Sequence, residues 1–277
     1  MLAHFHTMPE LPEVEVTRRG VASRVAGKRL DALVVRTHKL RYEVDADLPQ
    51  RLAGLQLTAV HRRGKYLLFD FGAGHLLVHL GMSGALRFVA AAAPPQRHDH
   101  ADLCFGDIRL RFSDPRRFGA MLWLHGDPLQ HPLLARLGVE PLSRQFTAAW
   151  LRQALAGRRA PIKQVIMDAG LLVGVGNIYA AESLFTAGID PRTSAARIAP
   201  LRLQRLTRAI RSTLAAAIRA GGSSLRDYSA ADGVLGRFQL HHKVYGRAGE
   251  ACPGCGAKIR RIRQGGRSTF YCPRCQR

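Results

Sequence analysis

Four of the five cysteines fall into two short pairs near the C-terminal end of the chain. Cys252 and Cys255 are separated by two residues, as are Cys272 and Cys275, and sixteen residues lie between the pairs. This spacing is typical of a structural zinc site with four thiolate ligands, which leaves no open position for catalysis. An iron–sulfur cluster is the alternative. Paired cysteines in one short segment favour a reduced, metal-bound hairpin over a disulfide framework.

The insert between the cysteine pairs has the pattern of two short strands joined by a tight turn. Strands are expected over residues 259–263 and 268–271, with Gly265-Gly266 as the turn. The segment 245–277 carries eight lysines and arginines against a single acidic residue. A hairpin with this charge is suited to contact a phosphate backbone, and we expect Arg267 near its tip.

The charge of the whole chain indicates a polyanionic partner. The 277 residues include 42 Lys+Arg and 20 Asp+Glu, a difference of 42 − 20 = +22. Hydrophobic residues make up 47% of the chain, which excludes a disordered polybasic tail. No apolar run approaches the roughly 20 residues that span a bilayer, and the first residues lack the pattern of a secretory signal. We therefore expect a cytoplasmic protein that binds nucleic acid.

Short apolar segments separated by turn residues dominate the first half of the chain and predict an antiparallel β-sandwich. Strands are expected over residues 29–36, 55–62, 65–71, 75–80, 85–90, 102–105, 108–112 and 120–125, with Gly106-Asp107 as a hairpin turn. Helices are expected over 9–26, 147–156, 161–169, 177–187 and 200–220. The glycine- and serine-rich residues 221–236 predict a segment without packing. The fold class is therefore α+β and multidomain.

Four further motifs precede the cysteine pairs. They are Met8-Pro9-Glu10-Leu11-Pro12-Glu13-Val14-Glu15, His79-Leu80-Gly81-Met82-Ser83-Gly84, Asp114-Pro115-Arg116-Arg117-Phe118-Gly119 and Val173-Gly174-Val175-Gly176-Asn177-Ile178-Tyr179. In this order they resemble the motifs of bacterial formamidopyrimidine-DNA glycosylases, over essentially residues 8–277. The resemblance implies excision of oxidised purines, notably 8-oxoguanine and formamidopyrimidines, from duplex DNA in base excision repair. It also implies strand cleavage by β,δ-elimination at the resulting abasic site.

The resemblance implies a fold as well. Residues 8–127 would form an N-terminal catalytic β-sandwich with a leading helix, and residues 128–140 a linker. Residues 141–236 would form a helical domain with a helix–two-turn–helix motif, and 237–277 a zinc finger. Residues 1–7 would be an extension absent from the mature protein. We expect one structural zinc ion, no nucleotide cofactor, no membrane partner and a monomer in the bacterial cytosol that acts at the nucleoid.

The catalytic residues that the resemblance implies begin at Pro9. In the family, the secondary amine of an N-terminal proline attacks the anomeric carbon of the sugar and forms an iminium. An amide nitrogen has no available lone pair, so we expect Met8 to be the true start and to be removed. Glu10 matches the acid/base carboxylate. Lys65 matches a lysine at the lesion phosphate. Arg267 is the last residue of this catalytic set.

Further residues match contacts to DNA. Met82, Arg116 and Phe118 match the three side chains that fill the gap left by an extruded nucleotide, with Arg116 bonded to the cytosine opposite. The other expected DNA contacts are His98, Arg117, Lys163, Asn177 and Arg226.

Each of these residues also has an ordinary structural interpretation. Pro9 is a typical helix-start proline, Glu10 and Glu13 suit the first turn of a helix, and His79 and His98 fit core or surface positions equally well. An endonuclease VIII-like enzyme for oxidised pyrimidines is an alternative, disfavoured by Leu11 and by the Arg116/Phe118 pair. A non-catalytic zinc-finger protein that binds damaged DNA or structured RNA fits the charge and the cysteines equally well.

Overall fold

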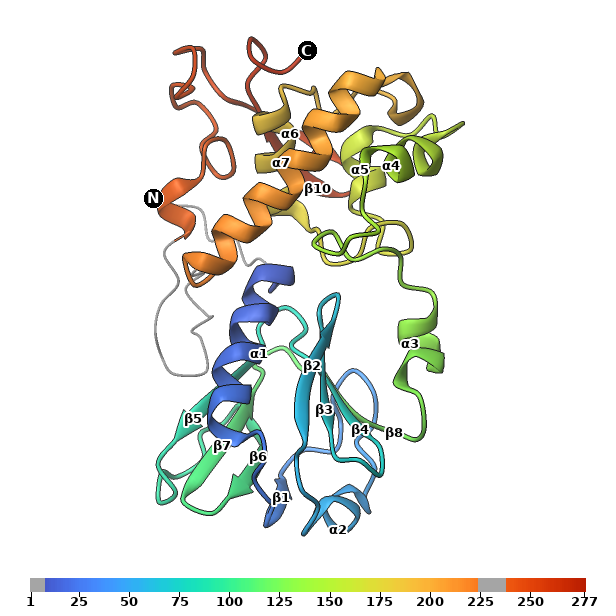
Figure 1. Cartoon of the computed structure of the whole chain (residues 1–277). Helices are drawn as coiled ribbons and strands as arrows, with labels where there is room; N and C mark the ends of the chain where they lie inside the picture. The colour runs from blue at the N-terminus through green and yellow to red at the C-terminus, as the bar shows by residue number, and fades with distance from the viewer. Residues whose placement is uncertain (1–7, 224–237) are drawn as a thin grey trace. The chain divides into compact units, whose positions relative to one another are not determined.

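The computed structural model describes residues 8–223 and 238–277. The chain divides into two compact units (Figure 1). Of the described residues, the first contains 8–135 and 220–223, and the second contains 136–219 and 238–277. The domain boundaries expected from the sequence stay predictions. Arg226, one of the expected DNA contacts, lies outside the described residues.

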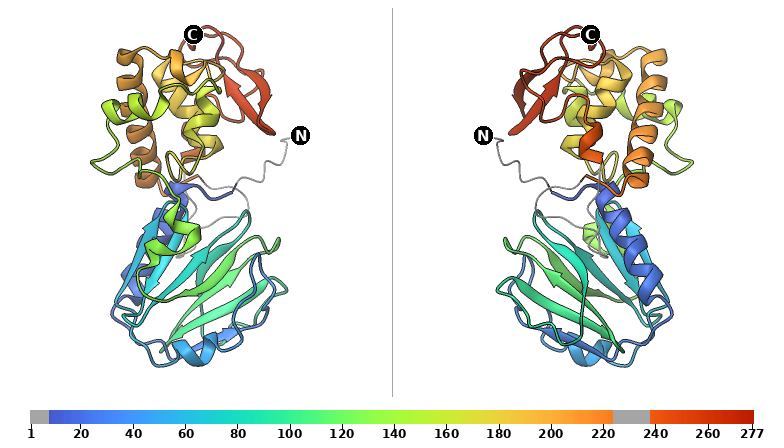
Figure 2. Two further views of the ribbon diagram at one scale, coloured as in Figure 1. Left: turned by 90° about the vertical axis from the view of Figure 1, so that its right-hand side faces the viewer. Right: turned by 90° about the vertical axis from the view of Figure 1, so that its left-hand side faces the viewer.

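Two four-stranded antiparallel sheets form the body of the first unit (Figure 2). One sheet has the order β1-β6-β7-β5 and the other β2-β3-β4-β8. The strands are β1 Ala32–Val35, β2 Ala59–Arg63, β3 Tyr66–Asp70, β4 His75–His79, β5 Ala85–Val89, β6 Asp99–Phe105, β7 Ile108–Ser113 and β8 Ala120–Leu124. Phe105 pairs with Ile108 across the two-residue turn at Gly106-Asp107. The β-sandwich expected from the sequence is confirmed.

The core of the first unit follows from the alternation of apolar side chains along the strands. In β6 and β7, Leu103, Leu110 and Phe112 are completely buried. The leading helix α1, Leu11–Val25, packs Val21 and Val25 into the same core. The sequence did not predict the short helix α2, Leu48–Leu52, because five residues show too little periodicity.

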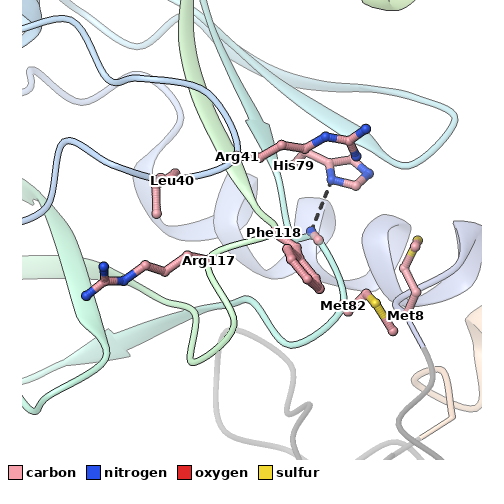
Figure 3. A pocket seen from close by; sticks show the side chains of 8 residues that line it. Met8, Leu40, Arg41, His79, Met82, Arg117 and Phe118 are labelled. Carbon is pink, nitrogen blue, oxygen red and sulfur yellow. Dashed lines mark hydrogen bonds between the residues drawn. The ribbon is translucent and has the colours of Figure 1, made fainter.

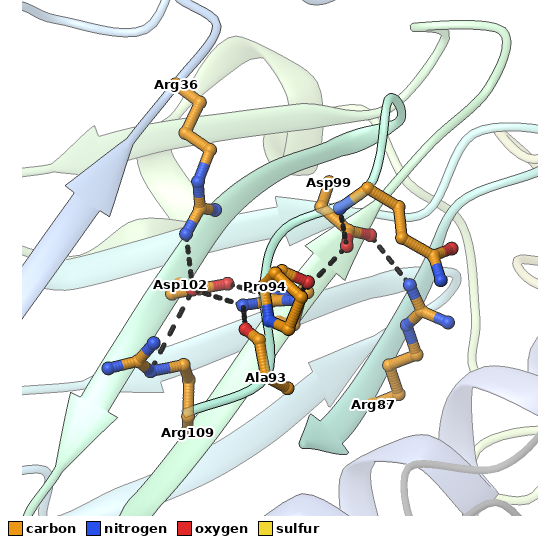
Figure 4. A network of polar contacts seen from close by, with 9 residues as sticks. Arg36, Arg87, Ala93, Pro94, Asp99, Asp102 and Arg109 are labelled. Carbon is orange, nitrogen blue, oxygen red and sulfur yellow. Dashed lines mark hydrogen bonds and ion pairs between the residues drawn. The ribbon is translucent and has the colours of Figure 1, made fainter. Parts of the chain in front are cut away.

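A buried network of charges covers part of the sheet formed by β1, β6, β7 and β5 (Figure 4). The side chains of Asp99 and Asp102 are 0% exposed. Arg111, with a side chain that is 2% exposed, donates to Asp102 at 2.8 Å and to Asp99 at 3.3 Å. Burial alone would raise the pKa of Asp102, but hydrogen bonds from Arg111 and Arg36 outweigh it and lower that pKa. Arg111 is therefore the shared partner of two buried carboxylates.

Replacing Arg111 by methionine is expected to lower the free energy of unfolding by about 3–5 kcal/mol, because two buried carboxylates lose their common partner. Urea denaturation at pH 7 measures the loss. Arg19→Met removes an arginine that is 60% exposed, and should cost less than about 1 kcal/mol. A lowered acid pKa gives stability above the unfolded value near ~3.9 that disappears as the pH falls through the folded value. The difference between wild type and R111M should therefore shrink in acid, and equal losses for the two variants would contradict the network's role.

The second unit combines helices with the C-terminal hairpin. Its elements are α4 Ala148–Leu155, α5 Ile162–Ile166, α6 Asn177–Ala187, η2 Ala195–Arg197, α7 Pro200–Arg219, η3 Phe238–His241, β9 Arg260–Gln264 and β10 Arg267–Tyr271. Helix α5 ends earlier than expected, because the Asp168 carboxylate accepts from the Gly170 amide and closes a turn. The hairpin and its Gly265-Gly266 turn are as expected, since Gln264 pairs with Arg267.

The segment between the sandwich and the helices contains two short elements, η1 Pro128–Gln130 and α3 Pro132–Ala135, inside the stretch expected as a linker. Along α7, Arg211 donates to the Ser143 carbonyl at 2.7 Å, so part of the arginine stripe on this helix is structural. None of the helices within residues 8–223 and 238–277 is long and apolar enough to cross a membrane.

Candidate nucleic-acid and catalytic site

The start of α1 fixes Pro9 and Glu10 in a buried position. Pro9 is buried, and Glu10 is the N-cap of α1 with an exposed fraction of 3%. A reciprocal capping box joins Glu10 to Glu13: the Glu10 amide donates to Glu13 Oε2 at 2.9 Å, and the Glu10 carboxylate accepts from the Glu13 amide. The capping box therefore fixes the buried carboxylate of the residue that follows Pro9 in the chain.

Glu13 also holds a segment far along the chain. Its second carboxylate oxygen, Oε1, accepts from the Ser223 amide at 2.8 Å, and Ser223 is completely buried. The sequence predicted residues 221–236 to lack packing, and that prediction is wrong for Ser223. The reason is a contact across 210 positions that a local pattern does not reveal.

Lys65 lies in the two-residue turn between β2 and β3, rather than in the strand expected over 65–71. Arg62 donates to the Gly64 carbonyl at 2.9 Å and to Glu15 at 3.0 Å, which ties this turn to α1. Burial would raise the pKa of Glu15, but hydrogen bonds from Arg18 and two other arginines lower it to about 2. The carboxylate is therefore ionised at neutral pH and anchors the turn that carries Lys65.

The first unit contains a cavity of about 500 Å³ (Figure 3). Its lining residues are Met8, Leu40, Arg41, His79, Gly81, Met82, Arg117 and Phe118. Phe118 is 44% exposed, which is unusual for a large apolar side chain. The Arg116 guanidinium lies 4.9 Å from the centre of the Phe118 ring. The structure thus brings Met82 and Phe118 together at one cavity, with Arg116 stacked against the Phe118 ring.

His79 lines the same cavity as a neutral hydrogen-bond donor. Burial lowers its pKa to about 4, and the positive charges of Lys65 and Arg41 act in the same direction. The Gly81 amide donates to His79 Nδ1 at 3.1 Å, so Nε2 carries the proton of the neutral ring. The sequence left His79 open between a phosphate contact and a core position, because its burial depends on strand pairing.

The two other expected contacts in this unit are His98 and Arg117, of which Arg117 lines the cavity. His98 is half-buried, and its carbonyl accepts from the Asp114 amide at 3.0 Å. Arg117 is exposed and has a φ of 56°, the one positive φ among non-glycine residues in the described parts of the chain. Their contacts to DNA stay predictions.

In the second unit, Lys163 and Asn177 form part of an internal network. Lys163 is 1% exposed, and its ammonium donates to Asn177 Oδ1 and Thr269 Oγ1 at 2.6 Å and to the Ser268 carbonyl at 3.2 Å. Asn177, the first residue of α6, donates from its amide to the same Ser268 carbonyl at 3.0 Å. Arg267, the neighbour of Ser268, is exposed at the start of β10. A phosphate contact by Lys163 stays a prediction that requires its ammonium to give up one of these bonds.

Glu182 is a buried structural carboxylate of the second unit that the sequence analysis missed. It is 3% exposed, and its carboxylate accepts from the amides of Lys243, Val244 and Tyr245 at 2.8–3.0 Å. Burial raises its pKa, and these amides act against the rise. Glu182 thereby holds the segment that leads into the cysteine hairpin. An acidic residue inside an otherwise apolar helix was the signal available in the sequence.

The four cysteines have the geometry that one tetrahedral zinc ion requires. Their sulfurs all lie within 4.8 Å of one another, with 3.8 Å between Cys252 and Cys275 and 3.5 Å between Cys255 and Cys272. Four sulfurs at about 2.3 Å from a central ion would be about 3.8 Å apart. Backbone amides donate to the sulfurs of Cys252 and Cys272, which favours thiolates. The donor set therefore fits zinc.

Family models match almost the whole chain. The formamidopyrimidine-DNA glycosylase N-terminal domain matches residues 8–121, the H2TH domain of the same glycosylase matches 137–229, and the zinc finger found in FPG and IleRS matches 249–277. Among curated proteins, the formamidopyrimidine-DNA glycosylase of Aromatoleum aromaticum is 58% identical and that of Acidithiobacillus ferrooxidans is 55% identical. Each alignment covers 98% of this chain and 100% of the relative.

Solved structures give the same result. The Lactococcus lactis protein in complex with DNA containing Fapy-dG has a TM-score of 0.91 and 35% identity, covering 97% of this chain and 100% of that one. The Thermus thermophilus MutM (FPG) protein has a TM-score of 0.87 and 41% identity, covering 97% and 98%. A complex of the wild-type Lactococcus lactis protein with DNA containing an oxidised pyrimidine has a TM-score of 0.90 and 34% identity, covering 97% and 100%.

Proposed function

The chain belongs to the formamidopyrimidine-DNA glycosylase family, and on that premise we propose that it excises oxidised purines from duplex DNA with Pro9 as its nucleophile. It is a base-excision-repair glycosylase with the abasic-site lyase activity of its family. The observation that carries the assignment of residues is the start of α1, where Pro9 is followed by a buried carboxylate held in a capping box.

The proposed chemistry starts with a free amine at Pro9. The pKa of an α-amino group is ordinarily about 7.7–8.0, so a useful fraction is neutral near pH 7. Its lone pair attacks C1′ of the sugar, the glycosidic bond breaks, and the departing base takes up a proton. The amine proton is then lost and the C1′–O4′ bond of the sugar ring breaks, with O4′ taking up a proton, so that the nitrogen lone pair forms the C1′=N bond of an iminium. The iminium acidifies C2′, and successive eliminations then break the C3′–O and C5′–O bonds. Glu10 lies beside Pro9 to move these protons.

The amine is free only in a chain that begins at Pro9. We propose that residues 1–8 are absent from the mature enzyme, because an amide nitrogen at Pro9 would be unreactive. The match of the N-terminal family model begins at residue 8, which supports this start.

Each unit offers its own proposed phosphate contacts. In the first unit these are Lys65 and the Nε2 donor of His79, and in the second they are Arg267 and Asn177. The net charge of +22 supports binding to a polyanion and opposes self-association. We infer a monomer that acts on DNA in the bacterial cytosol.

The specificity for a purine opposite cytosine is assigned to Arg116. Arg116→Ala should reduce the preference for 8-oxoguanine opposite cytosine over adenine by about tenfold, because one base-edge contact contributes ~1–3 kcal/mol of discrimination. Single-turnover excision rates on the two duplexes measure the ratio. Arg29, exposed elsewhere in the first unit, provides the control Arg29→Ala, which should keep the wild-type ratio. An unchanged ratio in R116A would remove this role from Arg116.

The substrate class is tested by comparing excision of 8-oxoguanine opposite cytosine with excision of thymine glycol opposite adenine. Faster release of the oxidised purine supports the proposal. Faster release of thymine glycol would instead assign the chain to oxidised pyrimidines.

A further inference from the structure

We propose that the Asp114 carboxylate and the Ser83 hydroxyl are positioning groups that hold Met82, Arg116 and Phe118 in one arrangement. The three side chains come from two separate turns, residues 80–84 (the Met82 turn) and residues 114–119 (the Phe118 turn). This inference rests on the gap-filling function proposed above for those side chains.

The two turns approach each other backbone to backbone. A Cβ atom on Gly81 would lie 2.5 Å from both the Phe118 carbonyl carbon and the Gly119 nitrogen. A Cβ atom on Gly119 would lie 2.8 Å from the His79 carbonyl oxygen. Glycine is therefore required at both positions, and no side chain separates the turns there. A small shift of one turn changes the position of the other, because packed backbone has no free space to absorb it.

Asp114 joins the two turns through hydrogen bonds. Its carboxylate is 0% exposed and accepts from Ser83 Oγ at 2.7 Å, across 31 positions in the chain. Within the Phe118 turn, the same carboxylate accepts from the Gly119 amide at 2.7 Å and from the Arg116 amide at 3.3 Å. The Ser83 oxygen in turn accepts from the Arg116 amide at 3.2 Å. The Asp114 carboxylate and the Ser83 hydroxyl are thus bonded to the backbone of Arg116 itself. Ser83 directly follows Met82, and the bonded Gly119 amide directly follows Phe118.

The Phe118 turn contains backbone strain that needs such support. Arg117 has a φ of 56°, a left-handed conformation that costs a residue with a Cβ atom free energy. A strained residue persists where its surroundings hold it. The Arg117 amide donates to the Asp114 carbonyl at 3.2 Å, so Asp114 closes the strained turn through its backbone as well as its side chain. Phe118 is 44% exposed and is therefore only partly held by packing.

The consequence is that the side chains of Met82, Arg116 and Phe118 are already in their working arrangement before DNA binds. Side chains that are already held in their working arrangement do not have to be ordered when the DNA opens. Removing the Ser83 hydroxyl leaves the buried carboxylate without one partner and removes the side-chain hydrogen bond that joins the Met82 turn to the Phe118 turn. The step that should slow is insertion into the duplex, which precedes attack on the sugar.

The test compares Ser83→Ala with Ser113→Ala. Ser113 also donates to a buried carboxylate of the first unit, that of Asp99, but belongs to neither turn. With 2-aminopurine next to 8-oxoguanine, the stopped-flow fluorescence rise reports unstacking. Ser83→Ala is expected to slow this rise about tenfold, the effect of one hydrogen bond to a charged group. Ser113→Ala should leave the rate at the wild-type value.

A second comparison separates positioning from a general loss of structure. In the Phe118→Ala background, Ser83→Ala is expected to slow unstacking by clearly less than tenfold, because Phe118, one of the three side chains that Ser83 positions, is gone. The wild-type protein gives a measurement that needs no variant: the amides of Arg116 and Gly119 should exchange slowly with solvent in the free enzyme, since both donate to Asp114.

Three results would overturn the positioning role: equal unstacking rates for the two serine variants, single effects that multiply in the double variant, or rapid exchange at both amides. A wild-type enzyme that fails to excise 8-oxoguanine would instead overturn the proposed function. The two failures are therefore distinguishable in one set of samples.

Discussion

A chain that keeps one extra residue in front of Pro9 is expected to lose covalent trapping on 8-oxoguanine DNA. Borohydride reduces an iminium to a stable amine link, so trapping reports the attack by Pro9 directly. An additional leucine between Met8 and Pro9 turns the reacting nitrogen into a planar amide whose lone pair is delocalised. Excision should fall on the order of a thousandfold or more, the scale at which enzymes lose activity with their nucleophile.

The matched control carries the same insertion followed by a protease site that ends directly before Pro9, so that cleavage removes the insertion and restores Pro9 as the first residue. Trapping should return with cleavage. Mass spectrometry of each sample verifies the N-terminus. Strand cutting at the wild-type rate by a chain whose first residue is shown to precede Pro9 would contradict the proposed nucleophile.

Cys272→Ser should remove the zinc and reduce the affinity for lesion-containing duplex by at least about a hundredfold. Metal binding and folding are coupled in small four-cysteine sites. The hairpin also carries Arg267, and its Thr269 hydroxyl accepts from the Lys163 ammonium, so losing the hairpin disturbs the phosphate contacts proposed in the second unit. The first unit should stay folded because the hydrophobic core of the sandwich contains none of these residues.

Fluorescence anisotropy with labelled duplex measures the affinity, and elemental analysis measures the zinc. Cys104 gives the control: it is a half-buried residue of β6, outside the four-cysteine cluster. Cys104→Ser should keep both zinc and affinity. Unchanged binding by a C272S protein that has lost all of its zinc would show that the hairpin is not part of the DNA contact.

Local patterns predicted most of the secondary structure and the metal chemistry. The strands of the sandwich, the turn at Gly106-Asp107 and the start of α6 at Asn177 follow from alternation and turn residues within a few positions. The four sulfurs meet because two short cysteine pairs flank a hairpin whose turn, Gly265-Gly266, is itself a local signal. Short elements such as α2 were not predicted, because they contain too few residues for a helical period to appear.

Spacing and periodicity therefore identified the zinc ligands and the sandwich, since each depends on neighbours in the chain. The protonation, burial and hydrogen bonding of the polar side chains, in contrast, depend on the tertiary structure. His79 is a neutral donor because strand pairing buries it, and Lys163 is internal because Thr269, 106 positions away, accepts a hydrogen bond from it. Ser83 meets Asp114 only when two turns of the sandwich come together. Burial and hydrogen bonding act between residues distant in sequence, and a one-dimensional pattern does not contain those distances.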